Sequence, residues 1–328
     1  MIEPAPYSEA INTSDDAELL RWVDRFDAAR SFDDLVDLAW ACEHALDRGH
    51  QLGGITAHAA YRLALHAPVA EFGEVMEIAD DRFTPGPFAE VLAFAHDASE
   101  IANELPDSAL RSVALAECAV RGASIADSEM VMFDTPGTLA TWEPEYALAS
   151  YTDTESEIPT YQPSPTSAQA LATDRITPPH SPERSNNTQR ALHDVVAHWA
   201  EHSTGRVESV TVEGDVHAAL ATLGIRRGML HAITPRDAFG LLAWAGASGA
   251  AHGRRRGAAA GRFAAWWAGA ALTGTEWPCD PDELGHALES LDWFTFDAGI
   301  PALGWQFRIA ATDVRGNRTW AVTAEDMS

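Results

Sequence analysis

Hydrophobic positions recur with a helical period in the first part of the chain. Between residues 15 and 122, apolar side chains return every three to four positions and short turns separate the runs. The pattern predicts about six helices with hardly any β-branched run among them. Consecutive short helices form a bundle or a solenoid, so we expect residues 1–123 to be an α-helical array, either bundle or HEAT-like. Residues 1–14 are expected to be a loose leader.

The second part is organised around the stretch from Pro235 to Leu272, in which a turn containing Arg254–Arg256 joins two nearly uncharged apolar segments. The second segment, Gly257–Leu272, is apolar on every side and carries one charge, Arg262, which predicts a buried helix. Small residues form a four-residue row along it, so we expect another backbone to approach closely. This row is Gly257, Gly261, Ala265 and Gly269.

Period-two alternation predicts strands around this helix. The predicted strands are Val207–Glu213, Trp293–Phe296 and a C-terminal hairpin of Trp305–Ala311 with Thr319–Thr323. Arg226–Ile233 fits either a short strand or the approach to the apolar helices. We therefore expect residues 188–328 to form a Trp-rich α+β domain, a small antiparallel sheet around a buried helix. The expected fold class is mainly α, and α+β overall.

Two segments between these parts lack a clear period. Residues 124–150 indicate an extended arm packed on one of the domains. Residues 151–187 are dominated by Pro, Ser, Thr and acidic residues with few large apolar side chains, which predicts a disordered or extended linker and the domain boundary.

Composition narrows the classes of partner. The 328 residues include 49 acidic and 22 basic residues, all of the latter arginine, for a formal net charge of −27. A surface this acidic repels phosphate groups, so we expect no nucleic-acid partner and no binding to anionic membranes. A membrane span is not expected either, because the apolar stretches are too short or carry Arg262 at their centre.

The cysteines indicate a reducing compartment. Cys42, Cys118 and Cys279 are widely spaced, odd in number and without a C-x-x-C pair, which argues against a disulfide framework. The first residues show no basic segment followed by an apolar one, so no export signal is visible. We expect a cytoplasmic protein with reduced thiols.

The tryptophan pattern of the C-terminal part resembles that of an uncharacterised family of high-GC bacterial proteins, a domain of unknown function. The shared residues are Gly261–Trp267, Trp277-Pro278, Pro281–Gly285, Trp293, Gly304-Trp305, Trp320-Ala321 and Ala324–Asp326. The resemblance supports the domain assignment and implies no reaction, cofactor or catalytic residue.

One motif suggests a metal. His198-Trp-Ala-Glu-His202 fits the H-x-x-E-H pattern of inverted zinc peptidases, with Glu276 or Glu283 as a third ligand. Against it, the helix stops directly after His202, and histidines in a last helical turn are favoured by the helix dipole alone.

His58, Arg62 and His66 share one helix face without an acid between them, so we expect a solvated or partner-facing stripe rather than a metal site.

Arginines provide a second candidate site. Arg255 and Arg256 precede the buried helix, whose N-terminus attracts anions, and could hold a phosphate or carboxylate group. Arg262 requires a carboxylate or carbonyl groups, because an unpaired buried guanidinium costs several kcal/mol. Its expected role is either a structural ion pair with Asp237, Asp297 or Asp313, or a ligand contact in a pocket walled by Trp266 and Trp305.

No motif in the chain specifies a reaction, so the favoured function is a non-enzymatic binding or protein-interaction module. A protein partner on the helical array is expected, and no cofactor. Two alternatives remain open: a zinc-dependent hydrolase at His198, Glu201 and His202, and a binder of an anionic small ligand at Arg255, Arg256 and Arg262.

Overall fold

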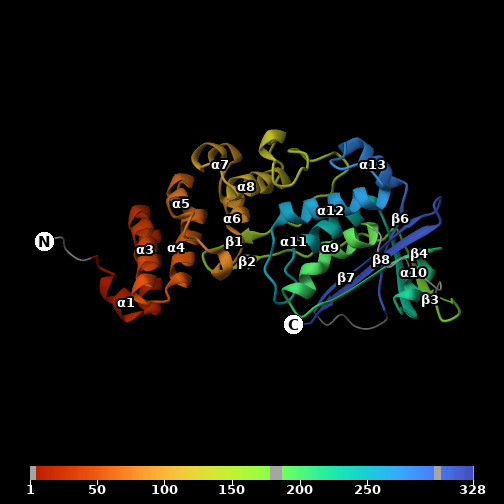
Figure 1. Ribbon diagram of the computed structural model, residues 1–328, viewed down its shortest axis with the longest axis horizontal. Helices are drawn as coiled ribbons and strands as arrows, with labels where there is room; N and C mark the ends of the chain where they lie inside the picture. The colour runs from red at the N-terminus through yellow and green to blue at the C-terminus, as the bar shows by residue number, and fades with distance from the viewer. Residues whose placement is uncertain (1–4, 178–186, 299–303, 328) are drawn as a thin grey trace. The chain divides into compact units, whose positions relative to one another are not determined.

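The computed structural model describes residues 5–177, 187–298 and 304–327 (Figure 1). The chain forms two compact units. Unit 1 contains Met1–Met132 and Ala149–Ile158, and unit 2 contains Phe133–Leu148 and Pro159–Ser328. Residues 133–148, which lie in the expected arm 124–150, thus belong to unit 2. The fold is α+β, as predicted.

The described part of unit 1 is built mainly from helices. They are α1 (Ser8–Thr13), α2 (Asp16–Ala29), α3 (Phe32–Ala45), α4 (Gly53–His66), α5 (Val69–Val75), α6 (Phe88–Ala95), α7 (Ala98–Glu104) and α8 (Ala109–Val120), with short 3-10 helices η1 (Leu46–Arg48), η2 (Asp81–Phe83) and η3 (Asp127–Glu129). The expected leader 1–14 is wrong where it is described, because it contains α1. Helix α7 was also not predicted, since Ile101 is its only buried residue and gives no hydrophobic period.

Helix α4 is the centre of unit 1. It packs against α2, α3, α5 and α6, and most of its residues are buried. Its neighbour α2 begins where Asp15 accepts the backbone N–H of Glu18 at 3.0 Å, a side-chain N-cap. The buried residues of α2 are Leu19, Val23 and Asp27, spaced by four and therefore on one face. This spacing places an acidic side chain in the α2–α4 interface.

Part of the expected linker is folded into unit 1. Strands β1 (Ser150–Tyr151) and β2 (Ser156–Glu157) pair antiparallel. The Tyr151 hydroxyl donates to the buried carboxylate of Glu90 at 2.8 Å, and Tyr61 donates to the backbone oxygen of Thr152 at 2.6 Å. The hairpin is thereby fixed to α6 and α4.

Unit 2 contains a six-stranded antiparallel sheet in the order β3-β5-β6-β7-β8-β4 (Figure 1). The strands are β3 (Ser167–Ala172), β4 (Arg206–Glu213), β5 (Arg227–Ile233), β6 (Asp292–Phe296), β7 (Trp305–Asp313) and β8 (Arg318–Asp326). The helices are α9 (Asn187–Glu201), α10 (Val216–Thr222), α11 (Pro235–Ala247), α12 (Ala258–Thr273) and α13 (Pro281–Glu289).

Strand β3 lies inside the segment 151–187, which was expected to be disordered. It pairs with β5 from Ser167 opposite Ala232 to Ala172 opposite Arg227. The prediction of a disordered or extended linker is therefore wrong where β1, β2 and β3 form, and residues 178–186 lie outside the described part. Only Leu171 of β3 is buried, so this edge strand carries no hydrophobic pattern that the sequence could reveal.

The sheet has a helix-covered core on each face. Alternate residues of β7 and β8 point to opposite faces, as the period-two pattern requires. One core contains Phe307, Ile309, Trp320 and Val322 together with side chains from α9, α11, α12 and α13. The other contains Ala310 and Ala321 together with side chains from α10. In Figure 1, α10 lies on the opposite side of the sheet from α9, α11 and α12.

Helices α11 and α12 cross with their backbones in contact, as the row of small residues predicted. A Cβ placed on Gly261 would lie 2.1 Å from the backbone oxygen of Ala243, and one on Gly246 would lie 3.3 Å from the Gly261 Cα. Helix α12 is mostly buried, but the prediction of burial on every side is wrong at Trp267, which is 41% exposed. None of the described helices combines the length and the apolar character needed to cross a bilayer.

Candidate functional site

The buried charge of α12 is neutralised by a carboxylate that the sequence did not single out. Arg262 is 1% exposed, and its Nε and one terminal nitrogen donate to the two carboxylate oxygens of Glu143, each at 2.8 Å. Its terminal nitrogens also donate to the backbone oxygens of Pro136 at 2.7 Å and Thr138 at 3.0 Å. The expected partners Asp237, Asp297 and Asp313 are therefore wrong, although the expected ion pair exists.

Glu143 is in turn saturated with hydrogen-bond donors. It accepts from the Ala140 backbone N–H at 2.8 Å, from the Trp266 indole N–H at 3.2 Å and from the Tyr146 hydroxyl. Burial by itself would raise the pKa of Glu143, but the hydrogen bonds and charge of Arg262 outweigh it and hold this pKa below its ordinary value. The cluster is closed, so Arg262 and Trp266 have a structural role and offer no free group to a ligand.

The remaining arginines and Trp305 face other neighbours. One terminal nitrogen of Arg256 lies 3.4 Å from Nδ1 of His198 and 3.5 Å from the backbone oxygen of Gly246. Trp305 stacks on Trp244 with ring centroids 5.6 Å apart. Arg255 is half-buried beside Arg256 in the turn before α12. The five side chains proposed to hold an anionic ligand thus do not line one pocket.

The H-x-x-E-H motif lies at the end of α9, as predicted, but its histidines are not arranged around a metal position. His198 is 7% exposed, and its Nε2–H donates to the backbone oxygen of Ser248. Its Nδ1 faces the Arg256 guanidinium. Both ring nitrogens are therefore engaged, whereas a zinc ligand needs a free lone pair. Among the described residues, no group of three metal-ligating side chains includes His198, His202 or Glu276.

His198 should make stability depend on pH. Burial, together with the charge of Arg256, lowers the pKa of His198 to about 4, even though the hydrogen bond to Ser248 acts in the opposite direction. The unfolded chain takes up this proton near pH 6.5 and the folded chain only near pH 4, so stability rises with pH between these values. We expect the urea midpoint of unfolding to fall as pH is lowered from 6.5 to 4. His198→Gln keeps a side-chain N–H donor and should reduce this pH dependence. The control His202→Gln, at an exposed position, should leave the dependence unchanged. Equal pH profiles for the two variants would contradict the assignment of the dependence to His198.

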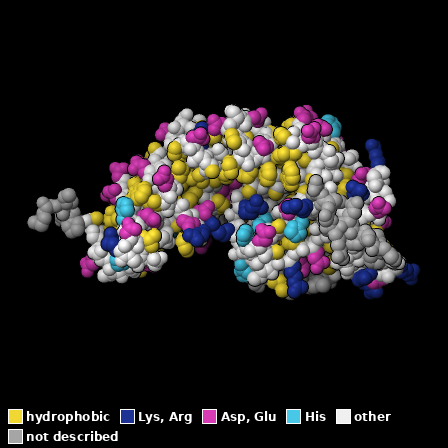
Figure 2. Space-filling model, in the orientation of Figure 1, with side chains coloured by type: hydrophobic (Ala, Val, Ile, Leu, Met, Phe, Trp, Pro, Cys, Tyr) yellow, Lys and Arg dark blue, Asp and Glu magenta, His cyan; other side chains and the backbone are white. Residues whose placement is uncertain are grey.

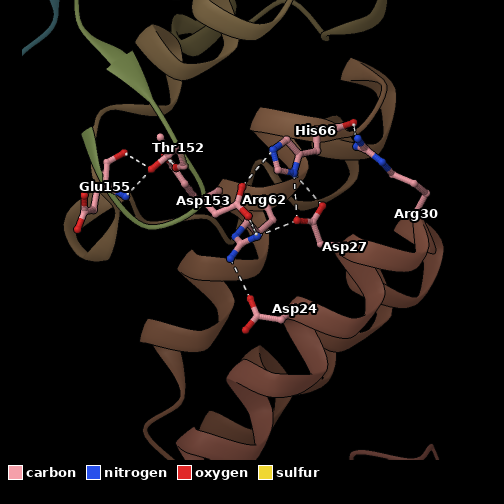
Figure 3. A network of polar contacts seen from close by, with 9 residues as sticks. Asp24, Asp27, Arg30, Arg62, His66, Thr152, Asp153 and Glu155 are labelled. Atoms are coloured by element: carbon pink, nitrogen blue, oxygen red, sulfur yellow. Dashed lines mark hydrogen bonds and ion pairs between the residues drawn. The ribbon is translucent and has the colours of Figure 1, made fainter. Parts of the chain in front are cut away.

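In unit 1, Arg62 and His66 of the predicted solvated or partner-facing stripe on α4 instead belong to an ion network whose centre, Arg62 and Asp27, is buried (Figure 3). Arg62 is 4% exposed and donates to Asp27 at 2.7 Å and to Asp24 at 2.8 Å, both on α2. It also lies 3.0 Å from Asp153, in the turn between β1 and β2. Nδ1 of His66 lies 2.9 Å from Asp27, and its Nε2 lies 3.3 Å from Asp153. The prediction of a solvated or partner-facing stripe failed because the acidic partners are not on α4 itself. They come from α2 and from the β1–β2 turn.

Asp27, His66 and Asp153 offer ligand atoms within 4.8 Å of one another, a spacing compatible with a metal ion. The guanidinium of Arg62, however, contacts both carboxylates from within the same cluster. It supplies the positive charge that a metal ion would supply, and a second cation there would be repelled. The geometry therefore indicates a structural network that fixes the β1–β2 turn to α4.

A pocket of about 540 Å³ lies in unit 2 between α9, α12 and the loop that follows α12. It is lined by small residues, two indole rings and two charged side chains. The lining residues are Arg190, Ala191, Asp194, Trp267, Ala270, Ala271, Gly274, Thr275 and Trp277. Figure 2 shows hydrophobic side chains at the surface in the region that α12 occupies in Figure 1.

The aromatic walls of this pocket are held in place by further rings. Trp267 and Trp277 pack edge to face, with centroids 5.4 Å apart and an interplanar angle of 79°. Phe263 also packs against Trp277, with ring centroids 5.8 Å apart, and Phe133 packs against Phe263 at 5.6 Å. The two indoles therefore form a fixed corner. Sequence reasoning missed the pocket, because its lining combines α9 with α12 and the loop after α12, which are far apart in the sequence.

The fold defines a two-unit α+β protein with a helical unit and a Trp-rich sheet unit. The chain belongs to a family of unknown function, DUF6183, whose model matches residues 17–328. This confirms the resemblance to an uncharacterised family and extends it from the C-terminal part to nearly the whole chain. Comparison with curated proteins and with solved structures found no match.

Proposed function

We propose that this protein is a non-enzymatic binding module whose small-molecule site is the pocket between α9 and α12. The observation that carries the proposal is the exposed Trp267, 41% exposed on a helix that is otherwise mostly buried, at a cavity of about 540 Å³. Small-molecule sites in proteins have volumes of about 300–1,000 Å³ and combine apolar walls with a few polar groups. This pocket has that size and that lining.

The state of the other candidate residues supports binding over catalysis. Arg262 and Glu143 are saturated by each other and by their neighbours, and both ring nitrogens of His198 are engaged. The thiols of Cys42 and Cys118 are buried, and burial raises the pKa of each to about 12, so neither is a ready nucleophile. We place the protein in the cytoplasm, a proposal supported by three cysteines that form no disulfide.

The pocket is tested by screening a library of small aromatic and aliphatic fragments by ligand-observed NMR against the full chain. We expect aromatic fragments to bind, and Trp267→Ala to weaken them about tenfold, because an aromatic pair is worth about 0.5–1.5 kcal/mol beyond the area it buries. A second variant, Ala271→Leu, adds bulk inside the pocket without removing a wall.

The control is Phe83→Ala, which removes a ring that is 61% exposed in unit 1. This variant should leave fragment binding unchanged. The absence of any bound fragment, or binding that is insensitive to both Trp267→Ala and Ala271→Leu, would show that the pocket is not a binding site.

A further inference from the structure

We propose that the ligand of this pocket is a small planar aromatic carboxylate, held by Arg190 and stacked on Trp267. The inference rests on the proposed function, since it names the class of molecule that the same pocket takes. Three features of the site carry it: the charge of Arg190, the shape of the aromatic corner and the small residues of the lining.

The positive charge at the pocket comes from Arg190, for which no counterion is found in the described part of the chain. The chain has 49 acidic residues to 22 arginines, and most of the buried or half-buried arginines of the described part are paired with them. No ion pair found among the described residues involves Arg190, which is exposed at the pocket. Its guanidinium presents a fork of N–H donors that matches a carboxylate.

Asp194, one turn along α9, is the opposing charge at the pocket. Its carboxylate lies 3.6 Å from Nδ1 of His193, on the same helix. The ion pair found for Asp194 among the described residues is the one with His193, not one with Arg190, although a spacing of four on a helix would allow the latter. Arg190 is thus the group available to a ligand, and Asp194 opposes an anion without blocking it.

The shape of the pocket favours a flat ring. Trp267 and Trp277 stand at 79° to each other, so a planar molecule can stack on the exposed face of one indole and meet the edge of the other. Ala270, Ala271 and Gly274 line the adjacent surface and leave room for a bicyclic ring. A stacked aromatic ring with a carboxylate directed to Arg190 satisfies both features of the site.

Three probes of equal size separate charge from stacking: 2-naphthoate, 2-naphthamide and 2-naphthylmethylammonium, titrated into the full chain by calorimetry at low salt. We expect naphthoate to bind at least about tenfold tighter than the amide, because hydrogen bonds to charged groups are roughly twice as strong as neutral ones. The ammonium should bind weakest. Arg190→Gln should reduce naphthoate binding to the level of the amide, and Asp194→Asn should strengthen it severalfold.

The outcomes distinguish the two proposals. Three results would overturn the carboxylate assignment: equal binding of all three probes, tighter binding of the amide or the ammonium, or no effect of Arg190→Gln. If the probes still lose binding in Trp267→Ala, the pocket would remain supported as a binding site. If none of the probes binds, or if Trp267→Ala does not weaken them, the binding-site proposal itself fails.

Discussion

Replacing Arg262 by alanine should lower the free energy of unfolding of unit 2 by about 3–5 kcal/mol, the cost of leaving one partner of a buried ion pair uncompensated. Glu143 would remain buried with a full charge, and the backbone oxygens of Pro136 and Thr138 would lose their donors. Urea denaturation followed by tryptophan fluorescence measures this loss.

The matched control is Arg227→Ala in the same unit. Arg227 pairs with Asp174 at 3.1 Å, but its side chain is 83% exposed, and pairs of this kind contribute about 0–1 kcal/mol. A double variant, Arg262→Met with Glu143→Leu, should recover much of the loss, because it removes both buried charges together. If Arg262→Ala costs no more than Arg227→Ala, the network is not a determinant of stability.

The same pair has a defined pH dependence. Because the pKa of Glu143 is lower in the folded chain than in the unfolded one, its contribution is complete above the ordinary titration range of a glutamate. That contribution decreases as pH falls towards the lowered pKa of the folded state. The acid limb of the stability profile should therefore be less steep in Arg262→Ala than in the natural sequence.

The features that the sequence predicted depend on residues close together in the chain. The apolar run of α12, the hairpin of β7 and β8 and the row of small residues all express periods of two or four residues. For Arg262 the sequence predicted the need for a partner but not which residue the partner is. Its lone charge in an apolar helix showed that a buried partner must exist, but Glu143 lies 119 positions away in a segment without a period, so the pattern could not identify it.

The features that the sequence did not reveal are set by tertiary contacts. Strand β3 is ordered by its ladder with β5, although its own side chains are mostly exposed. Arg62 on α4 is paired and buried because α2 and the β1–β2 turn bring Asp27 and Asp153 to it. In the same way, the H-x-x-E-H motif has the required spacing, but Ser248 and Arg256 engage the ring of His198. A local motif does not specify which groups the fold places against it.

Replacing Gly261 by valine should destabilise unit 2 by about 3 kcal/mol or more, and by alanine about 2 kcal/mol. Helix propensity alone gives the opposite expectation, since alanine is better than glycine in a helix interior by about 1 kcal/mol. At Gly261 the close contact between the two helices outweighs helix propensity, so we expect the substitution to destabilise. An added Cβ would lie 2.1 Å from the backbone oxygen of Ala243 and 2.8 Å from the Ala247 Cβ, so α11 and α12 would have to move apart.

Gly269 on the same helix provides the control for this prediction. A Cβ there would meet the Leu288 Cδ2 at 3.3 Å and the Leu284 Cδ1 at 3.6 Å, which are the ends of flexible side chains. Gly269→Ala should therefore be neutral or slightly stabilising when unfolding is measured by urea denaturation. Stabilisation by both alanine substitutions would mean that the two backbones are not in contact at Gly261. A loss confined to Gly261 shows that the small residue is required by the crossing of the helices, and not by its position within α12.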